Sequence, residues 1–313
     1  MDFSPDYSLV CYQVGNYKYS EENYMEAIEK FIKSKELGYS TKEADDQLIF
    51  CYQKLNQYDK VIEIAQYYID QGMDEYGFYS TNIAEAYSGK GNKDMEFAYY
   101  DYAVQNGISK EISLFERAGA YQKYGELDKA MDDLNEICTM SENFSIAFGK
   151  RGDILFQQEN YEAALKDYSH ALEQRESGYT YCKRGKTYLK LRHYPEALLD
   201  FNRAEHLDGG SEDLYNARGV VYAQMKNYEC ALADYFNALA YKPDDATYLY
   251  NIGWVYSKKE EYNNAIDYFT QSINSDNKDY KGYSERAVAY KAMGEKAKAE
   301  ADFEKAKELR GEN

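Results

Sequence analysis

The stretch at residues 219–243, GVVYAQMKNYECALADYFNALAYKP, decides the fold of this chain. Two apolar-patterned runs flank the polar turn KNY, and this arrangement predicts two helices joined by a short turn. A glycine inside a helix destabilises it by about 1 kcal/mol relative to alanine, so Gly219 needs a packing reason. Comparison of this stretch with the rest of the chain supplies that reason.

One pattern recurs along the chain at spacings of 33 to 35 residues. With Ala231 as the anchor, the equivalent positions are Ala27, Val61, Glu96, Ala130, Ala164, Ala197, Ala231, Ala265 and Ala299. Twelve residues before the anchor most copies have a small residue, and nine before it seven copies have tyrosine. An aromatic or apolar residue usually follows the anchor by four positions, and alanine or serine by seven. These offsets lie on one helix face, so each copy is predicted to be a helical hairpin.

The hairpin explains the glycine at the start of the quoted stretch. Small residues are expected where two helix axes approach most closely, and aromatic residues fill the wider gap beside them. We therefore expect Gly219 to lie where the neighbouring helix leaves no room for a side chain. A globular helical bundle is the alternative, but it would not require near-constant spacing.

The repeated unit resembles the tetratricopeptide repeat, a helix–turn–helix of about 34 residues. The resemblance is carried by the small-residue slot, the tyrosine, the anchor alanine and Pro243, which ends its unit. It implies an all-α, right-handed superhelical solenoid whose first helices line a concave groove for peptides or partner proteins. The expected domain is a single array over residues 1–313, in which the charged last helix acts as the C-terminal cap. The expected repeats are 8–41, 42–76, 77–110, 111–144, 145–177, 178–211, 212–245, 246–279 and 280–313.

Two positions vary together among the nine copies. Five copies have arginine thirteen residues before the anchor, and the same five have aspartate three residues after it; the other four have neither. Common ancestry of these five copies is one explanation. The other is an ion pair inside each hairpin, and the predicted structural pairs are Arg117–Asp133, Arg151–Asp167, Arg184–Asp200, Arg218–Asp234 and Arg286–Asp302.

The resemblance also places groove residues at offsets −18, −15, −11, −8 and −7 from the anchor. Seven lysines and five acids stand there, although the whole chain has a net charge of −18. Trp254, the only tryptophan, is a candidate aromatic anchor for a partner. The candidate groove residues are Tyr179, Lys186, Lys190, Tyr250, Asn251, Trp254, Lys258 and Lys281. An alternative role for the lysines at helix ends is to stabilise the helix dipole.

Asn251 and Lys281 further resemble part of a carboxylate clamp. Some members of the family use such a clamp of Lys, Asn and Arg to hold the acidic tail of heat-shock chaperones. Here Asn216 and Val220 stand where the clamp expects lysine and asparagine one unit earlier, and Arg286 is one residue late. The clamp is therefore expected to be incomplete.

Composition excludes several function classes. The net charge of −18 disfavours nucleic acid, and no run approaches the roughly 20 apolar residues of a membrane helix. The three histidines lack metal-ligand spacing, and there is no phosphate-binding loop, nucleophile elbow or HExxH motif. We therefore expect no catalytic residue, no cofactor and no metal. The five cysteines form no CxxC pair, which favours reduced thiols in a cytoplasmic protein.

These observations favour a non-catalytic interaction scaffold that holds a partner peptide or protein in its groove. The lysines suggest that the partner offers an acidic segment or a C-terminal carboxylate. One alternative is a peptide-sensing regulator whose superhelix changes pitch when it binds a ligand, and another is a co-chaperone that binds a chaperone tail. A further alternative is self-association through the N-terminal end, which lacks a charged cap.

Overall fold

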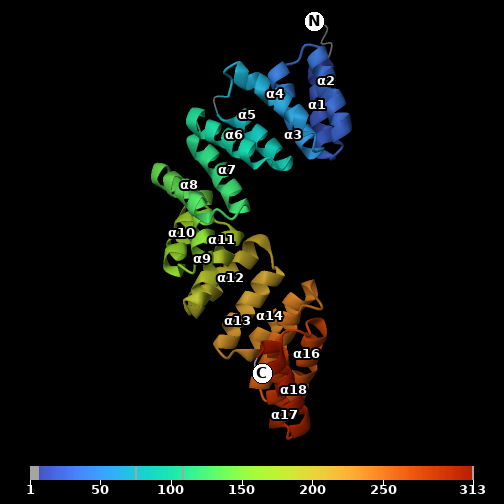
Figure 1. Cartoon of the computed structure of the whole chain (residues 1–313), viewed down its shortest axis with the longest axis vertical. Helices are drawn as coiled ribbons and strands as arrows, with labels where there is room; N and C mark the ends of the chain where they lie inside the picture. The colour runs from blue at the N-terminus through green and yellow to red at the C-terminus, as the bar shows by residue number, and fades with distance from the viewer. Residues whose placement is uncertain (1–6, 75, 108, 312–313) are drawn as a thin grey trace. The chain divides into compact units, whose positions relative to one another are not determined.

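The computed structural model describes residues 7–74, 76–107 and 109–311. Within these ranges the chain folds into eighteen α-helices joined by short loops, with no strand (Figure 1). The predicted all-α fold is confirmed. None of these helices combines the length and the apolarity that crossing a membrane requires.

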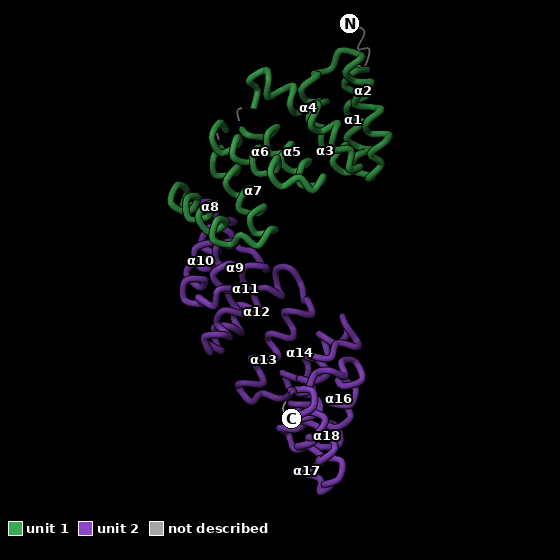
Figure 2. The backbone as a smooth tube through the Cα atoms, viewed as in Figure 1, with its two compact units in different colours: residues 1–142 green, residues 143–313 purple. Residues whose placement is uncertain are grey.

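The chain divides into two compact units, Met1–Glu142 and Asn143–Asn313 (Figure 2). The helices of the first unit are α1 (Tyr7–Ser20), α2 (Tyr24–Glu36), α3 (Thr41–Lys54), α4 (Tyr58–Asp70), α5 (Phe78–Gly89), α6 (Lys93–Asn106), α7 (Lys110–Lys123) and α8 (Leu127–Met140). Those of the second are α9 (Ser145–Gln157), α10 (Tyr161–Gln174), α11 (Gly178–Lys190), α12 (Tyr194–Asp208), α13 (Glu212–Gln224), α14 (Tyr228–Tyr241), α15 (Ala246–Lys258), α16 (Tyr262–Ser275), α17 (Tyr280–Ala292) and α18 (Lys296–Arg310).

Within each unit, helices pack mainly against their neighbours in sequence. In every hairpin except α3–α4, the odd-numbered helix packs most extensively against the even-numbered helix that follows. Within each unit, that even-numbered helix also packs against the first helix of the next hairpin. In the second unit the odd-numbered helices α9, α11, α13, α15 and α17 also contact one another in order. They form a shared surface, which we call the first-helix face. The arrangement of all nine hairpins as one array over residues 1–313 stays a prediction.

The small-residue slot has the packing reason that the sequence required. A Cβ atom built on Gly219 would lie 2.7 Å from the ring of Tyr235, which stands four residues after the anchor on α14. A Cβ on Gly253 would lie 2.8 Å from the ring of Phe269. In both hairpins the glycine lets the aromatic ring lie directly on the backbone of the first helix.

The turn KNY closes its hairpin by a specific backbone geometry. Lys226 adopts a left-handed conformation with φ of 60°, which reverses the chain after α13. Asn227 then caps α14, because its side-chain oxygen accepts a hydrogen bond from the backbone N–H of Cys230 at 3.3 Å. The turn therefore fixes where the second helix begins.

Candidate functional site

The predicted arginines and aspartates lie next to each other within their hairpins. In the pair Arg218–Asp234, Nε donates to Oδ2 at 2.8 Å and Nη2 donates to Oδ1 at 2.9 Å. The other four pairs form the same two bonds, with distances of 2.6 to 2.9 Å. All five aspartates are buried. Each pair therefore joins the first helix of a hairpin to its second helix.

The arginines also make contacts that the sequence analysis missed. Nη1 of Arg218 donates to the side-chain oxygen of Asn202 at 2.8 Å and to Glu205 at 2.6 Å, both on α12 of the preceding hairpin. The corresponding atoms of Arg117, Arg184 and Arg286 donate to Asp101, Ser169 and Thr270. Asn202, Asp101, Ser169 and Thr270 share one sequence signal, because each stands five residues after the anchor of the preceding copy, whereas Glu205 stands eight after it. These four arginines thus join neighbouring repeats as well as the helices of one repeat.

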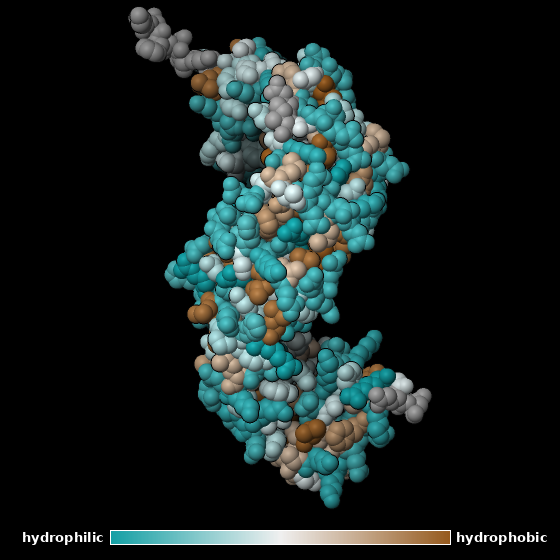
Figure 3. Space-filling view, turned by 90° about the vertical axis from the view of Figure 1, so that its left-hand side faces the viewer, coloured by the Kyte–Doolittle hydropathy of each residue, from teal (hydrophilic) through white to brown (hydrophobic). Residues whose placement is uncertain are grey.

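The eight predicted groove residues all lie on first helices of the unit Asn143–Asn313. Tyr179, Lys186 and Lys190 are on α11, and Lys281 is the second residue of α17. The other four, Tyr250, Asn251, Trp254 and Lys258, are on α15. On the face of the molecule that Figure 3 shows, hydrophobic residues form small separate patches within a mostly hydrophilic surface.

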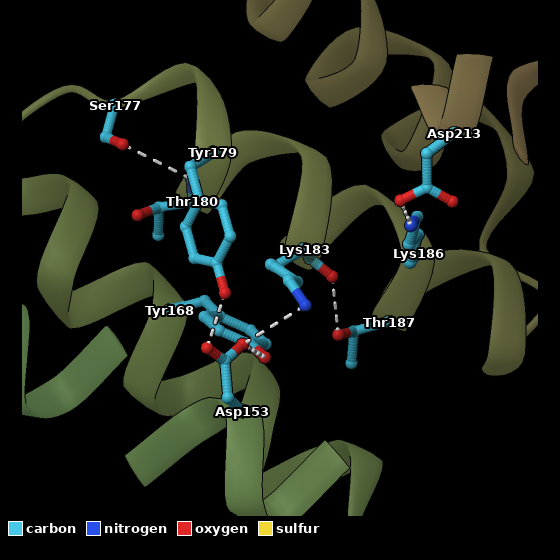
Figure 4. A network of polar contacts seen from close by, with 9 residues as sticks. All are labelled: Asp153, Tyr168, Ser177, Tyr179, Thr180, Lys183, Lys186, Thr187 and Asp213. Carbon is cyan, nitrogen blue, oxygen red and sulfur yellow. Dashed lines mark hydrogen bonds and ion pairs between the residues drawn. The ribbon is translucent and has the colours of Figure 1, made fainter. Parts of the chain in front are cut away.

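Tyr179 stands in a polar network between α9 and α11 (Figure 4). Its hydroxyl donates to Oδ2 of Asp153 at 2.6 Å, while Tyr168 donates to Oδ1 of the same carboxylate at 2.7 Å. The ammonium group of Lys183 lies 3.7 Å from Asp153 and 5.1 Å from the centroid of the Tyr179 ring. Burial and the hydrogen bond to Asp153 raise the pKa of Tyr179 above its ordinary value. The ring is fixed in position although 53% of the residue is exposed.

Lys186 is not a free cation. Its ammonium group forms an ion pair with Asp213, which lies on the next first helix, α13 (Figure 4). Asp213 is one of the five acids at the groove offsets, because it stands 18 residues before the anchor Ala231. The spacing therefore located both residues but not their mutual pairing. In contrast, Lys190, Lys258 and Lys281 form no ion pair within the described residues and are exposed. Lys190 and Lys258 lie in the last turns of their helices, where the dipole alternative also places them.

Trp254 is half-buried between two hydrophobic clusters. On one side it packs against the cluster of α13, α14 and α15 that contains Tyr235, and on the other against the cluster of α16 and α17 that contains Phe269. The ammonium group of Lys258 lies 5.0 Å from the indole centroid. Tyr250 packs 5.7 Å from Phe269, and burial raises the pKa of Tyr250 to about 12. The indole is thus fixed, with a cation over its ring.

The residues that resemble a carboxylate clamp have other partners. The side-chain amide of Asn251 donates to the oxygen of Asn216 at 2.9 Å, so the two asparagines bridge α13 and α15. Arg286 is bound to Asp302 and Thr270. Of the two cations in this set, Arg286 is in an ion pair, whereas Lys281 forms none within the described residues.

Two cavities open beside Tyr179, and neither was predicted from the sequence. The larger, of 540 Å³, lies between α9 and α11, and Ile146, Gly149, Asp153 and Tyr179 line it. The smaller, of 340 Å³, lies between α11, the end of α12 and the start of α13. Ile146 could have been found, because it occupies the same offset from its anchor as Tyr179. Across the described ranges, no three His, Cys, Asp or Glu side chains come together as a metal site would require.

Comparison with known families gives matches in the second unit. Two family models match the chain, and both are described as tetratricopeptide repeat. One matches residues 147–177, 246–279 and 280–313, and the other matches residues 182–246. Together they cover just over half of the chain.

Among curated proteins, the chain is similar to Hsp70-Hsp90 organizing proteins of plants. It is 26% identical over 206 residues to that of Triticum aestivum, covering 63% of this chain and 34% of the relative. It is 23% identical over 204 residues to Hsp70-Hsp90 organizing protein 3 of Arabidopsis thaliana, covering 62% and 35%. The matched region therefore spans about a third of the length of these relatives.

Solved structures share the fold at low sequence identity. The APC/C hetero-tetramer Cut9-Hcn1 gives a TM-score of 0.56 at 16% identity, over 98% of this chain and 74% of that chain. The pilF protein of Pseudomonas aeruginosa gives 0.55 at 14% identity, over 65% and 93%. MamA of Desulfovibrio magneticus RS-1 gives 0.51 at 18% identity, over 53% and 94%. These likenesses concern the fold alone.

Proposed function

Because the chain belongs to the tetratricopeptide repeat family, we propose that it is a non-catalytic scaffold that binds a partner peptide or protein. The binding surface is the first-helix face of the unit Asn143–Asn313. The proposal includes one continuous array over residues 1–313. It also includes a cytoplasmic location, which the five cysteines support because none of them stands in a CxxC pair.

The observation that carries this proposal is the position of Trp254. Two hydrophobic clusters fix its indole on the first-helix face, while Lys258 places a cation over the ring at 5.0 Å. Tryptophan is among the residue types that most often contribute a large share of the binding energy of an interface. A partner residue that covers the indole would bury apolar area without ordering a flexible side chain.

The partner is proposed to be acidic. Lys190, Lys258 and Lys281 form no ion pair within the described residues, whereas the chain as a whole has a net charge of −18. A carboxylate-rich segment, or a free C-terminal carboxylate, would find unpaired cations on this face. Lys186 contributes to binding only when the partner displaces Asp213 from it.

A more specific proposal is that the acidic partner is a chaperone tail. The similarity to Hsp70-Hsp90 organizing proteins favours this proposal. The contacts of Asn251 with Asn216 and of Arg286 with Asp302 work against it, because both residues already have partners. We therefore propose the general acidic segment rather than this specific tail. A regulator that changes pitch remains the alternative, and scattering would distinguish it by compaction on binding.

The test is a binding measurement with labelled peptides of equal length, one rich in glutamate and one rich in lysine. Wild-type protein should bind the acidic peptide, with affinity that falls as salt rises. Trp254→Ala should weaken binding about tenfold or more. Leu199→Ala is the control, because Leu199 is 71% exposed on α12, a second helix outside the face. Preference for the lysine peptide, or equal binding by Trp254→Ala and wild type, would overturn the proposal.

A further inference from the structure

Gly149 is a glycine inside helix α9 that packing does not explain. A Cβ atom built on it would have no neighbour within 4 Å. Three residues later, a Cβ on Gly152 would lie 2.8 Å from the ring of Tyr168, so that glycine is required by the hairpin. An interior glycine destabilises a helix relative to alanine, and nothing in the described fold offsets this at Gly149.

The missing side chain of Gly149 opens the larger cavity on the first-helix face. Gly149, Ile146 and Asp153 lie on one side of α9, because positions three and four apart share a helix face. The opposite wall is Tyr179 on α11, held by its 2.6 Å hydrogen bond to Asp153. Ile146 is 55% exposed and Tyr179 is 53% exposed. Two large apolar surfaces therefore face a cavity whose floor is bare backbone.

The charged groups around this cavity differ in whether they already have a partner within the protein. Asp153 is held by two tyrosines, and Glu176 accepts two hydrogen bonds from Arg203 at 2.8 Å. Arg175, at the end of α10, forms no ion pair within the described residues. Asp208 lies over Gly178 at the start of α11, where the helix dipole favours a negative charge. An acidic residue beside an apolar one would find Arg175 available.

We propose that Gly149 is the floor of a subsite that accepts one bulky apolar side chain of an acidic partner segment. The side chain would lie between Ile146 and the ring of Tyr179, and a neighbouring carboxylate would meet Arg175. The absence of a Cβ at Gly149 sets the depth of the subsite and so selects leucine- or phenylalanine-sized residues. This inference rests on the proposed function and names what the partner presents to α9 and α11.

The experiment uses the full chain and labelled acidic peptides that differ at one central position, which is leucine, phenylalanine, alanine or lysine. Wild type should bind the leucine and phenylalanine peptides about tenfold or more tightly than the alanine peptide. In Gly149→Ala and Gly149→Gln this preference should shrink toward none. Gly149→Ala should also raise the melting temperature by about 1–3 °C, because alanine favours the helix.

Gly149→Ala is thus expected to weaken the peptide preference while it raises the melting temperature. A purely structural role of Gly149 would not produce these opposite effects. Ser284→Ala is the matched control, because Ser284 occupies the same offset on α17 and lies outside the cavity. It should leave the peptide preference unchanged. A lower melting temperature in Gly149→Ala would reveal a packing role and overturn the subsite.

Failure of the subsite and failure of the proposed function give different results. Binding that needs Trp254 and acidity, but ignores the central residue and Gly149, would overturn the subsite alone. Absence of binding by every acidic peptide would overturn the proposed function, and the subsite with it.

Discussion

The guanidinium group of Arg218 on α13 and the carboxylate of Asp234 on α14 face each other in two hydrogen bonds of 2.8 and 2.9 Å. Only 10% of the arginine side chain and 5% of the aspartate side chain are exposed. Two nearly buried charges are stable only as long as each keeps its partner. The same arginine reaches back to Asn202 and Glu205, so one side chain supports both a hairpin and its junction with the preceding hairpin.

Arg218→Met should therefore destabilise the protein strongly. The expected loss is about 3–5 kcal/mol of unfolding free energy, because Asp234 would be left charged and unpaired. Urea denaturation followed by circular dichroism measures it. Arg203→Met is the control, since the side chains of Arg203 and its partner Glu176 are about half exposed and such pairs contribute about 0–1 kcal/mol. Equal losses in the two variants would contradict a special role for Arg218.

Gly219→Ala should destabilise the protein by about 1–3 kcal/mol, although alanine is the better helix former. The new methyl group would lie 2.7 Å from the ring of Tyr235. A double-mutant cycle with Tyr235→Leu tests the cause, because the smaller side chain removes the clash. The loss from Gly219→Ala should be smaller in that background, whereas additive losses would mean that the ring is not responsible.

Glu96 occupies an anchor slot that alanine fills in most copies, and it is 1% exposed. Its carboxylate accepts hydrogen bonds from Ser88 at 2.8 Å and from Tyr124 at 2.6 Å. Tyr124→Phe should cost about 1–3 kcal/mol of unfolding free energy, because it removes a donor from a buried carboxylate. Introducing Glu96→Ala into that variant should recover part of the loss. Tyr102→Phe, at an exposed tyrosine of α6, should change nothing.

Tyr168 should make stability fall at alkaline pH. It is fully buried, and burial together with Asp153 raises its pKa above the ordinary value near 10. Above about pH 10 the unfolded chain loses this proton while the folded chain keeps it, so the folded state binds more protons. The unfolding free energy then decreases as pH rises, by up to about 1.4 kcal/mol per pH unit from this residue.

Unfolding free energies measured between pH 8 and 11 test this prediction. Tyr168→Phe has no such proton, so its unfolding free energy should fall less steeply with pH than that of wild type. Parallel curves for the two proteins would show that Tyr168 does not contribute to the alkaline loss.

Much of the fold could be predicted from the sequence because repeated helices interact mainly with their neighbours. The pattern around Gly219 and Tyr235 located both helices of the hairpin and the close contact between them. The pattern of arginine and aspartate located side chains that the structure places within hydrogen-bonding distance. The two bonds from Nη1 of Arg218 were missed because their acceptors belong to the preceding copy, and only the packing of one repeat on the next brings them close.

The candidate site was less predictable than the fold. Offsets from the anchor placed Tyr179 and Lys186 on first helices, but they did not show that Asp153 and Asp213 engage them. Pairing between first helices depends on rotamers and on the separation of adjacent repeats, neither of which a spacing encodes. The cavity above Gly149 was missed for a related reason. The sequence alone does not distinguish a glycine that packing requires from a glycine that leaves a cavity.

By itself, the sequence determined the repeat period, the two helices of each hairpin and the positions where small and aromatic residues must meet. It could do so because these features depend on residues within one repeat and recur nine times in the same order. Only the tertiary structure decided which charged side chains form ion pairs, which groove lysines form none within the described residues, and where a cavity opens on the first-helix face. Those outcomes depend on how one repeat packs against the next. That geometry arises from contacts between repeats rather than from the order of residues within a single repeat.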